Sequence, residues 1–231
     1  MDVVISIGGS VLAPSRGPER VAAWADAIDE LVEAGHQLGI VVGGGAIARE
    51  YIETARALGA DEIALDDLGI AVTRVNARLL IAALGDTVHP EPAHDYAAAK
   101  TQLRSADVAV MGGTSAGHTT DAVAAALAER IGADLLVLAT SVPGVFDADP
   151  EHDETARQYD RLTAAELVEE MSALALNAGS RAPVDVLAAK LIDRAGLPTI
   201  VLDGSDPGTT VRAINTSEHG GTDITPTPRH D

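Results

Sequence analysis

The chain opens with Val3-Val4-Ile5-Ser6-Ile7-Gly8-Gly9-Ser10, an apolar run that ends in a pair of glycines. The same order returns at Leu38-Gly39-Ile40-Val41-Val42-Gly43-Gly44-Gly45 and at Val108-Ala109-Val110-Met111-Gly112-Gly113-Thr114. Strands that are apolar throughout, rather than in alternation, are typical of a parallel sheet with both faces covered. These stretches therefore predict an α/β fold in which glycine loops follow the ends of parallel strands.

Strands and helices alternate along the rest of the chain. Apolar runs predict further strands at 135–139 and 199–202, and a last short strand at 222–224. Helical spacing predicts helices over 19–34, from the triple glycine to about 57, and over 68–84, 94–103, 120–131, 163–174 and 184–195. We expect a three-layer α/β/α sandwich around a mainly parallel sheet, with residues 1–231 forming one domain.

Acidic residues dominate the charge of the chain. Its 231 residues include 16 Lys and Arg against 35 Asp and Glu, which gives a formal net charge of −19. This excess argues against binding nucleic acid or an anionic membrane through phosphate groups. Lysine occurs only at Lys100 and Lys190. An Asp-rich, Lys-poor surface favours the salt-rich cytoplasm of a halophile over an ordinary acidic enzyme.

Cysteine is absent, and no apolar run approaches the length of a membrane span. The absence of cysteine excludes disulfides, thiolate metal sites and cysteine nucleophiles. The first residues lack the basic segment of a secretion signal, so we expect a cytoplasmic protein. Neither lysine follows the glycine pattern of a P-loop, which excludes that type of phosphate site as well.

The three glycine loops suggest how a chain so poor in lysine would bind phosphate. In an open parallel sheet, ligands bind beyond the carboxyl ends of the strands, where all three loops are expected to lie. Glycine allows main-chain N–H groups to approach phosphate oxygens, and a following helix adds the positive end of its dipole. A single glycine pair could equally be a tight turn, but three in one sheet favour an anion site.

Two longer stretches make the assignment more specific. They are Gly112-Gly113-Thr114-Ser115-Ala116-Gly117-His118-Thr119-Thr120-Asp121-Ala122 and Ala139-Thr140-Ser141-Val142-Pro143-Gly144-Val145-Phe146-Asp147-Ala148-Asp149-Pro150. They appear in family order, from about residue 3 to residue 224, together with the first two glycine loops, Asp66-Asp67-Leu68-Gly69-Ile70 and Thr73-Arg74-Val75-Asn76-Ala77. The chain resembles the amino-acid-kinase superfamily and, within it, the UMP kinases of the archaeal type.

The resemblance implies two neighbouring nucleotide sites, with transfer of the γ-phosphoryl group of ATP to UMP and Mg²⁺ bound to ATP. The acceptor half would span about 1–132 and the ATP-binding half about 133–231. The residues implied for ATP are Gly9, Ser10, Gly45, Arg49, Thr140, Phe146 and Asp149. Those implied for UMP are Gly44, Asp66, Thr114, Ser115, Ala116, Gly117, His118, Thr119 and Thr120. Relatives further imply a homohexamer, with the long alanine-rich helix as a plausible contact surface.

Asp121 and Arg49 are the residues implied for catalysis. Asp121 would organise the charges around the transferred phosphoryl group, although an acidic residue in a first helical turn is favourable by itself. Arg49 follows a helix start, where a cation is unfavourable unless an anion binds there; the alternative is a surface pair with Glu53. His118 is not expected to act as a base, because a phosphate acceptor is already largely ionised. Phe146, the only phenylalanine, is either a ligand contact or a loop anchor.

Ser6 departs from the superfamily pattern, because many members place a lysine there that contacts the transferred phosphoryl group. In this chain the missing charge would come from Mg²⁺, Arg49 and the main-chain donors of residues 8–10. Lys190 is an alternative source, although its helical pattern also fits a solvated residue. Arg74 and Arg78, one turn apart on the long helix, would support the acceptor or a subunit contact, or lie on the surface.

Other proteins of the same fold are the nearest alternatives. Isopentenyl phosphate kinases carry a histidine soon after the triple glycine, where this chain has Ala46-Ile47-Ala48-Arg49. Acetylglutamate kinases carry Asn-x-Asn-x-Asp where this chain has His118-Thr119-Thr120-Asp121. Both contrasts favour UMP as the acceptor. A third alternative is a protein that binds a nucleotide or an oxyanion without catalysis, as the molybdate-storing relatives do.

Overall fold

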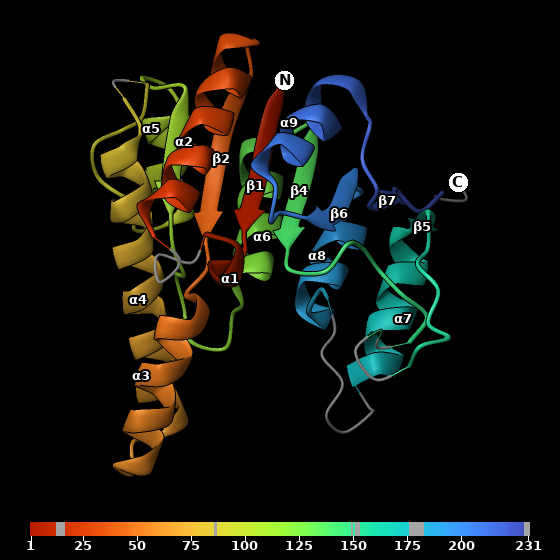
Figure 1. Ribbon diagram of the computed structural model, residues 1–231, viewed down its shortest axis with the longest axis horizontal. Helices are drawn as coiled ribbons and strands as arrows, with labels where there is room; N and C mark the ends of the chain where they lie inside the picture. Colours follow the sequence, from red (N-terminus) through yellow and green to blue (C-terminus); the bar gives the residue numbers. More distant parts are fainter. Residues whose placement is uncertain (13–16, 86, 149, 151–152, 176–182, 229–231) are drawn as a thin grey trace.

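The computed structural model describes residues 1–12, 17–85, 87–148, 150, 153–175 and 183–228. Its centre is a seven-stranded sheet with the strand order β3-β2-β1-β4-β6-β7-β5 (Figure 1). The strands are β1 (Asp2–Ile7), β2 (Gln37–Val42), β3 (Val108–Met111), β4 (Leu135–Thr140), β5 (Arg161–Thr163), β6 (Thr199–Asp203) and β7 (Thr222–Thr225). Neighbouring strands run parallel except for β6 and β7, which confirms the mainly parallel sheet.

Helices cover both faces of this sheet. They are α1 (Gly9–Leu12), α2 (Pro18–Glu33), α3 (Gly45–Ala57), α4 (Glu62–Ala83), α5 (Tyr96–Gln102), α6 (Thr120–Ile131), α7 (Ala164–Ala175), α8 (Val186–Ala195) and α9 (Pro207–Thr216). Successive residues of a strand point to opposite faces of the sheet, so the core consists of two clusters, one on each face. Ile5 and Ile40 pack in the same cluster as residues of α2, α4 and α9, whereas Val4 and Val41 pack with residues of α6 and α8. The three-layer sandwich is therefore confirmed.

Four elements depart from the sequence prediction because local caps or small size decide them; the first is the four-residue helix α1, which is not predicted. Helix α4 begins at Glu62 rather than 68, since the Asp61 side chain accepts a hydrogen bond from the Ala64 N–H at 2.9 Å. Helix α9 is not predicted, because its sequence is rich in weak helix formers; Asp206 caps it, and Val211 and Ile214 anchor it in the core. Strand β5 has only three residues and gives no periodic signal.

The order of the strands brings the three glycine loops to one edge of the sheet. Strands β3, β2 and β1 are neighbours and parallel, so Gly112, Gly43 and Gly8 leave the sheet at the same ends. This confirms the predicted location of the loops. Among the described residues, no helix is long and apolar enough to cross a membrane.

Candidate functional site

A cleft of about 290 Å³ opens beside the glycine loops, between α3, α4 and the loop that follows β3. Its lining consists of Gly44, Gly45, Ala48, Arg49, Ile52, Asp66, Gly69, Ile70, Thr73, Gly113, Ser115, His118, Thr119 and Thr120. The polar side chains of this lining are four hydroxyls together with Arg49, Asp66 and His118, while Ile52 and Ile70 are apolar. The combination suits a ligand with an anionic end and a flat, less polar end.

The first two glycine loops pack directly against each other, main chain on main chain. A Cβ at Gly9 would lie 2.6 Å from the carbonyl carbon of Gly44, and one at Gly43 would lie 2.5 Å from the Gly9 nitrogen. Gly45 has a φ of +67°, in the left-handed region that favours glycine. No side chain fits between these loops, so their main-chain groups stay free of side chains beside the start of α3.

Two buried polar residues of α4 hold the second and third glycine loops in place. The Asn76 side chain donates to the carbonyl oxygens of Gly43 and Gly44 at 2.9 and 3.2 Å. The Thr73 hydroxyl accepts from the Gly113 N–H at 2.7 Å and donates to the Ile70 carbonyl at 2.6 Å. Neither residue is among the predicted site residues, although both lie in the stretch 73–77 that contributes to the family resemblance. Their polarity within an otherwise apolar helix face is the signal that could have found them.

The loop from 114 to 119 closes over α4 and ends in the cap of α6. The Gly117 N–H donates to the Asp66 carboxylate at 2.7 Å, which ties the loop to α4. Thr119 is the N-cap of α6, and its side chain accepts from the Ala122 N–H at 3.1 Å. Asp66, in the second turn of α4, therefore fixes the loop by its carboxylate, whereas Thr119 sets where the next helix starts.

Asp121, in the first turn of α6, points at the sheet rather than into solvent. Its carboxylate accepts a hydrogen bond from the Ser6 hydroxyl on β1 at 2.8 Å. Burial raises the pKa of Asp121 from 3.8 to about 6; the Ser6 hydrogen bond acts in the opposite direction, and the negative charge of Asp185 raises the pKa further. A carboxyl group with so raised a pKa, directly below two glycine loops, is typical of a functional position.

Arg49 and Lys190 occupy different settings. Arg49 lies in the second turn of α3, lines the cleft, and its guanidinium approaches the Ser10 hydroxyl at 3.4 Å. Arg49 thus joins the first glycine loop to the second. Lys190 lies on α8 with an exposed side chain and is not part of the cleft lining.

The residues implied for the ATP half lie apart from this cleft. Thr140 ends β4, and its hydroxyl forms a local turn by donating to the Val142 carbonyl at 2.9 Å. Phe146 is half-buried and forms an isolated antiparallel bridge with Gln158. Asp149 lies outside the described residues.

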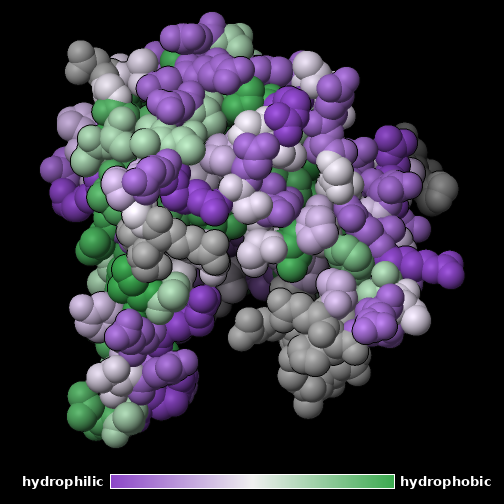
Figure 2. Space-filling view, in the orientation of Figure 1, coloured by the Kyte–Doolittle hydropathy of each residue, from purple (hydrophilic) through white to green (hydrophobic). Residues whose placement is uncertain are grey.

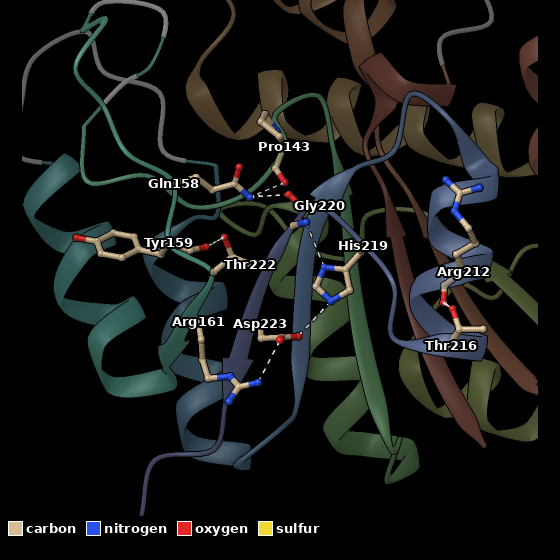
Figure 3. A network of polar contacts seen from close by, with 11 residues as sticks. Pro143, Gln158, Tyr159, Arg161, Arg212, Thr216, His219, Gly220, Thr222 and Asp223 are labelled. Atoms are coloured by element: carbon tan, nitrogen blue, oxygen red, sulfur yellow. Dashed lines mark hydrogen bonds and ion pairs between the residues drawn. The ribbon is translucent and has the colours of Figure 1, made fainter.

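The Phe146 loop is fastened to the end of the chain by a network of polar contacts (Figure 3). Thr222 accepts from the Val145 N–H at 2.9 Å and donates to the Tyr159 carbonyl at 2.6 Å. Beside it, the nearly buried His219 ring accepts from the Gly221 N–H at 3.1 Å and approaches the Asp223 carboxylate at 3.2 Å. Because one ring nitrogen accepts from Gly221, the other carries the proton that it donates to Asp223.

The structure thus brings together most of the residues implied for the acceptor, and divides those implied for ATP. The predicted UMP residues that line the cleft are Gly44, Asp66, Ser115, His118, Thr119 and Thr120. Thr114, Ala116 and Gly117 belong to the same loop but not to the lining. Gly45 and Arg49, implied for the phosphates of ATP, line this same cleft. Gly9 packs under it, and Ser10 contacts Arg49.

Comparisons with known proteins show the family to which the chain belongs. The profile of the amino acid kinase family matches residues 1–203. A uridylate kinase from Halobacterium salinarum is 61% identical over 226 residues, which cover 98% of this chain and 94% of that protein. One from Haloarcula marismortui is 58% identical over 226 residues, which cover 98% and 99%. The crystal structure of a uridylate kinase from Archaeoglobus fulgidus superposes with a TM-score of 0.87 at 43% identity, over 97% of this chain and 100% of that one.

Proposed function

The chain belongs to the amino acid kinase family, and we propose that it is a uridylate kinase, which transfers the γ-phosphoryl group of ATP to UMP. The products are ADP and UDP, on the route to UTP and CTP. The observation that carries this proposal is the cleft in which Gly44, Asp66 and the loop from 115 to 120 meet. Those are the positions that the motif match assigns to the acceptor, in a chain 61% identical to a uridylate kinase over nearly its whole length.

UMP would bind with its phosphate at the start of α3 and its uridine toward the loop from 114 to 120. Main-chain N–H groups of Gly44 and Gly45, together with the positive end of the α3 dipole, suit a phosphate dianion. Ile52 and Ile70 offer an apolar surface to the flat base. Asp66, already bonded to Gly117, would place the ribose. This half corresponds to about residues 1–132.

ATP would bind on the other half, about residues 133–231, with its phosphates at residues 8–10. The Phe146 loop, fastened through Thr222 to β7, would hold the base end of the nucleotide. Mg²⁺ would arrive on the phosphates of ATP, as part of that substrate. It supplies positive charge to the oxygens of the transferred group.

The chemistry needs alignment and charge more than proton removal. The attacking oxygen of UMP is already largely ionised near neutral pH, so the transfer needs no general base. The attacking and leaving oxygens would lie in line with the transferred phosphorus. Asp121 would keep Ser6 and the first turn of α6 fixed beneath the transferred group. The main-chain donors and Arg49 would stabilise charge on the phosphoryl oxygens.

Arg49 is expected to contribute to turnover, whereas Lys190 is not. Replacing Arg49 with alanine should lower kcat about 100-fold, because one charged donor on the phosphoryl oxygens is lost. Arg49→Lys should recover part of the rate, since it restores the charge without the planar fork. Steady-state kinetics with Lys190→Ala as the matched control would measure this. Equal rates for Arg49→Ala and the wild type would remove Arg49 from the mechanism.

Other acceptors are separated by a single assay. ADP release, measured in molar KCl, would be compared for UMP, CMP, dUMP, isopentenyl phosphate and acetylglutamate. We expect UDP and ADP in equal amounts with UMP, and much slower release with the others. ATP binding without ADP release would favour a storage or sensing protein instead. The molar KCl follows from the net charge of −19 and from relatives in halophilic archaea.

The long helix α4 would form a contact between subunits of a homo-oligomer. The family resemblance implies a hexamer built from dimers, which needs such a contact surface. Figure 2 shows apolar residues on the side of the molecule where α3 and α4 lie. Val75 and Leu79, both on α4, are exposed large apolar residues. Between α2 and α4 lies an apolar groove of about 410 Å³, lined by Pro18, Val21 and Leu79 among others. A large exposed apolar surface is more typical of a protein–protein contact than of a surface that stays in solvent.

Changing Leu79 to glutamate is expected to split this assembly. A buried, unpaired carboxylate at a contact costs several kcal/mol, so the complex should dissociate toward smaller species. Light scattering in molar KCl would measure the mass, with Leu58→Glu as the control. Leu58 is 84% exposed at the end of α3 and lies outside the groove. An unchanged mass for the Leu79 variant would place the contact surface elsewhere.

A further inference from the structure

The Asp185 carboxylate, just before α8, bonds to two helices at once. One of its oxygens caps α8 by accepting from the N–H groups of Leu187 and Ala188 at 2.8 and 3.0 Å. The other oxygen accepts from the Thr119 hydroxyl, at the start of α6. Asp185 and Thr119 are 66 residues apart and belong to the two different halves of the chain.

The direction of the bond between Thr119 and Asp185 follows from the other contacts of the hydroxyl. The Thr119 oxygen already accepts from the Ala122 N–H at 3.1 Å, so its own proton is free to point at Asp185. Beyond this bond the two helices pack closely through buried alanines, among them Ala122, Ala188 and Ala189 in one cluster. The N-termini of α6 and α8 are therefore joined by a single carboxylate.

A cap alone does not account for this arrangement. Asn or Ser caps a helix about as well as Asp, and one side-chain oxygen is sufficient. Here the second oxygen and the negative charge are directed at the loop that carries Thr119 and, two residues later, Asp121. The groups of other elements that act on Asp121 are the Ser6 hydroxyl on β1 and this carboxylate. The repulsion between the carboxylates of Asp121 and Asp185 opposes folding. Because stability does not explain the pair, the pair points to a role in the site.

We propose that Asp185 is a positioning residue for phosphoryl transfer: by holding the Thr119 hydroxyl, it fixes the first turn of α6, with Asp121, against the ATP half. The inference rests on the proposed function, and it adds a residue that does not itself line the acceptor cleft. Asp185 links the loop around the acceptor to the helix that follows in the ATP half. Movement of one half relative to the other would misalign the donor and the acceptor, which in-line transfer does not tolerate.

The first test is Asp185→Asn, because asparagine keeps the cap of α8 and removes the charge. We expect a similar melting temperature, kcat about tenfold lower, and an almost unchanged KM for ATP. The acid limb of kcat should also move to lower pH, because the charge that raises the pKa of Asp121 is gone. A residue that only capped α8 would leave kcat unchanged, because asparagine keeps the cap. Asp206→Asn, which alters the equivalent cap of α9, is the matched control.

The second test approaches the same bond from the loop. Thr119→Val should lower kcat by a similar factor without moving the acid limb, since the charge of Asp185 remains. The double variant should be no slower than Thr119→Val alone, because that change already removes the bond to Asp185 along with the cap of α6. If Asp185→Asn and Thr119→Val both turn over like an active wild type, the inference is wrong and the proposed function stands. An inactive wild type would overturn the proposed function, and the inference with it.

Discussion

Asp121→Asn is expected to lose at least 100-fold in kcat and, above pH 6, to unfold less readily than the wild type. The loss of rate follows from the charge, because the carboxylate, held by Ser6 beside the glycine loops, would organise the charges around the transferred phosphoryl group. Asparagine has nearly the same shape and can still accept from the Ser6 hydroxyl, so the fold is retained. What disappears is a charge that the folded protein holds in a poorly solvated position.

The gain in stability follows from the raised pKa. Asp121 titrates at about 6 in the folded protein against an ordinary value of 3.8. The unfolded chain therefore releases the proton first, and the wild type loses stability as the pH rises from about 4 to about 6. Two pKa units correspond to ~3 kcal/mol, and because Asp121 keeps part of its surface in solvent, the expected cost is on the order of 2 kcal/mol.

Urea unfolding of both proteins at pH 4 and pH 8, in the same salt, measures this difference. The curves should nearly coincide at pH 4, and the variant should be the more stable at pH 8. Asp95→Asn is the matched control with the opposite sign, because the Ala98 N–H lowers the pKa of Asp95. A kcat of the Asp121 variant within tenfold of the wild-type value would contradict the catalytic role. A variant no more stable than the wild type at pH 8 would contradict the raised pKa.

Gly9→Ala is expected to lower kcat/KM for both nucleotides by at least 100-fold. A Cβ at this position would lie 2.6 Å from the carbonyl carbon of Gly44 and from the Cα of Gly45. These are main-chain atoms, so they cannot turn aside as the end of a flexible side chain can. The two loops would have to separate, which costs about 1–3 kcal/mol. That separation would displace the main-chain donors of both phosphate sites at once.

The control for Gly9→Ala is Gly85→Ala, because a Cβ at Gly85 meets no atom of the described residues within 4 Å. Kinetics with each nucleotide varied in turn, and urea unfolding, would be measured for both variants. The Gly85 variant should behave as the wild type. A Gly9 variant that loses stability but keeps its kinetic constants would show that the contact between the loops supports the fold alone.

Much of the fold could be predicted because its strands are short apolar runs with glycine directly after them. A run such as residues 38–42 fixes both a buried strand and the point where it ends. Helix α9 and strand β5 could not be predicted in the same way, since caps and tertiary contacts determine them rather than periodicity. The start of α4 depends on one hydrogen bond between Asp61 and Ala64.

The acceptor cleft could be predicted for the same reason, because parallel neighbouring strands carry their loops to one edge. The supports of the cleft could not. Asn76 binds the carbonyls of Gly43 and Gly44 only because α4 packs beside that loop, which no local pattern encodes. The bond between Thr119 and Asp185 joins segments distant in the chain, so it becomes visible only in three dimensions.

A crystal structure with UMP and a non-hydrolysable ATP analogue bound together tests the central claim most directly. The account predicts the phosphate of UMP against the main-chain N–H groups of Gly44 and Gly45, and the terminal phosphate of the analogue against residues 8–10. The two phosphates would face each other in line, with Arg49 beside them. Phosphates bound away from these glycine loops would contradict it.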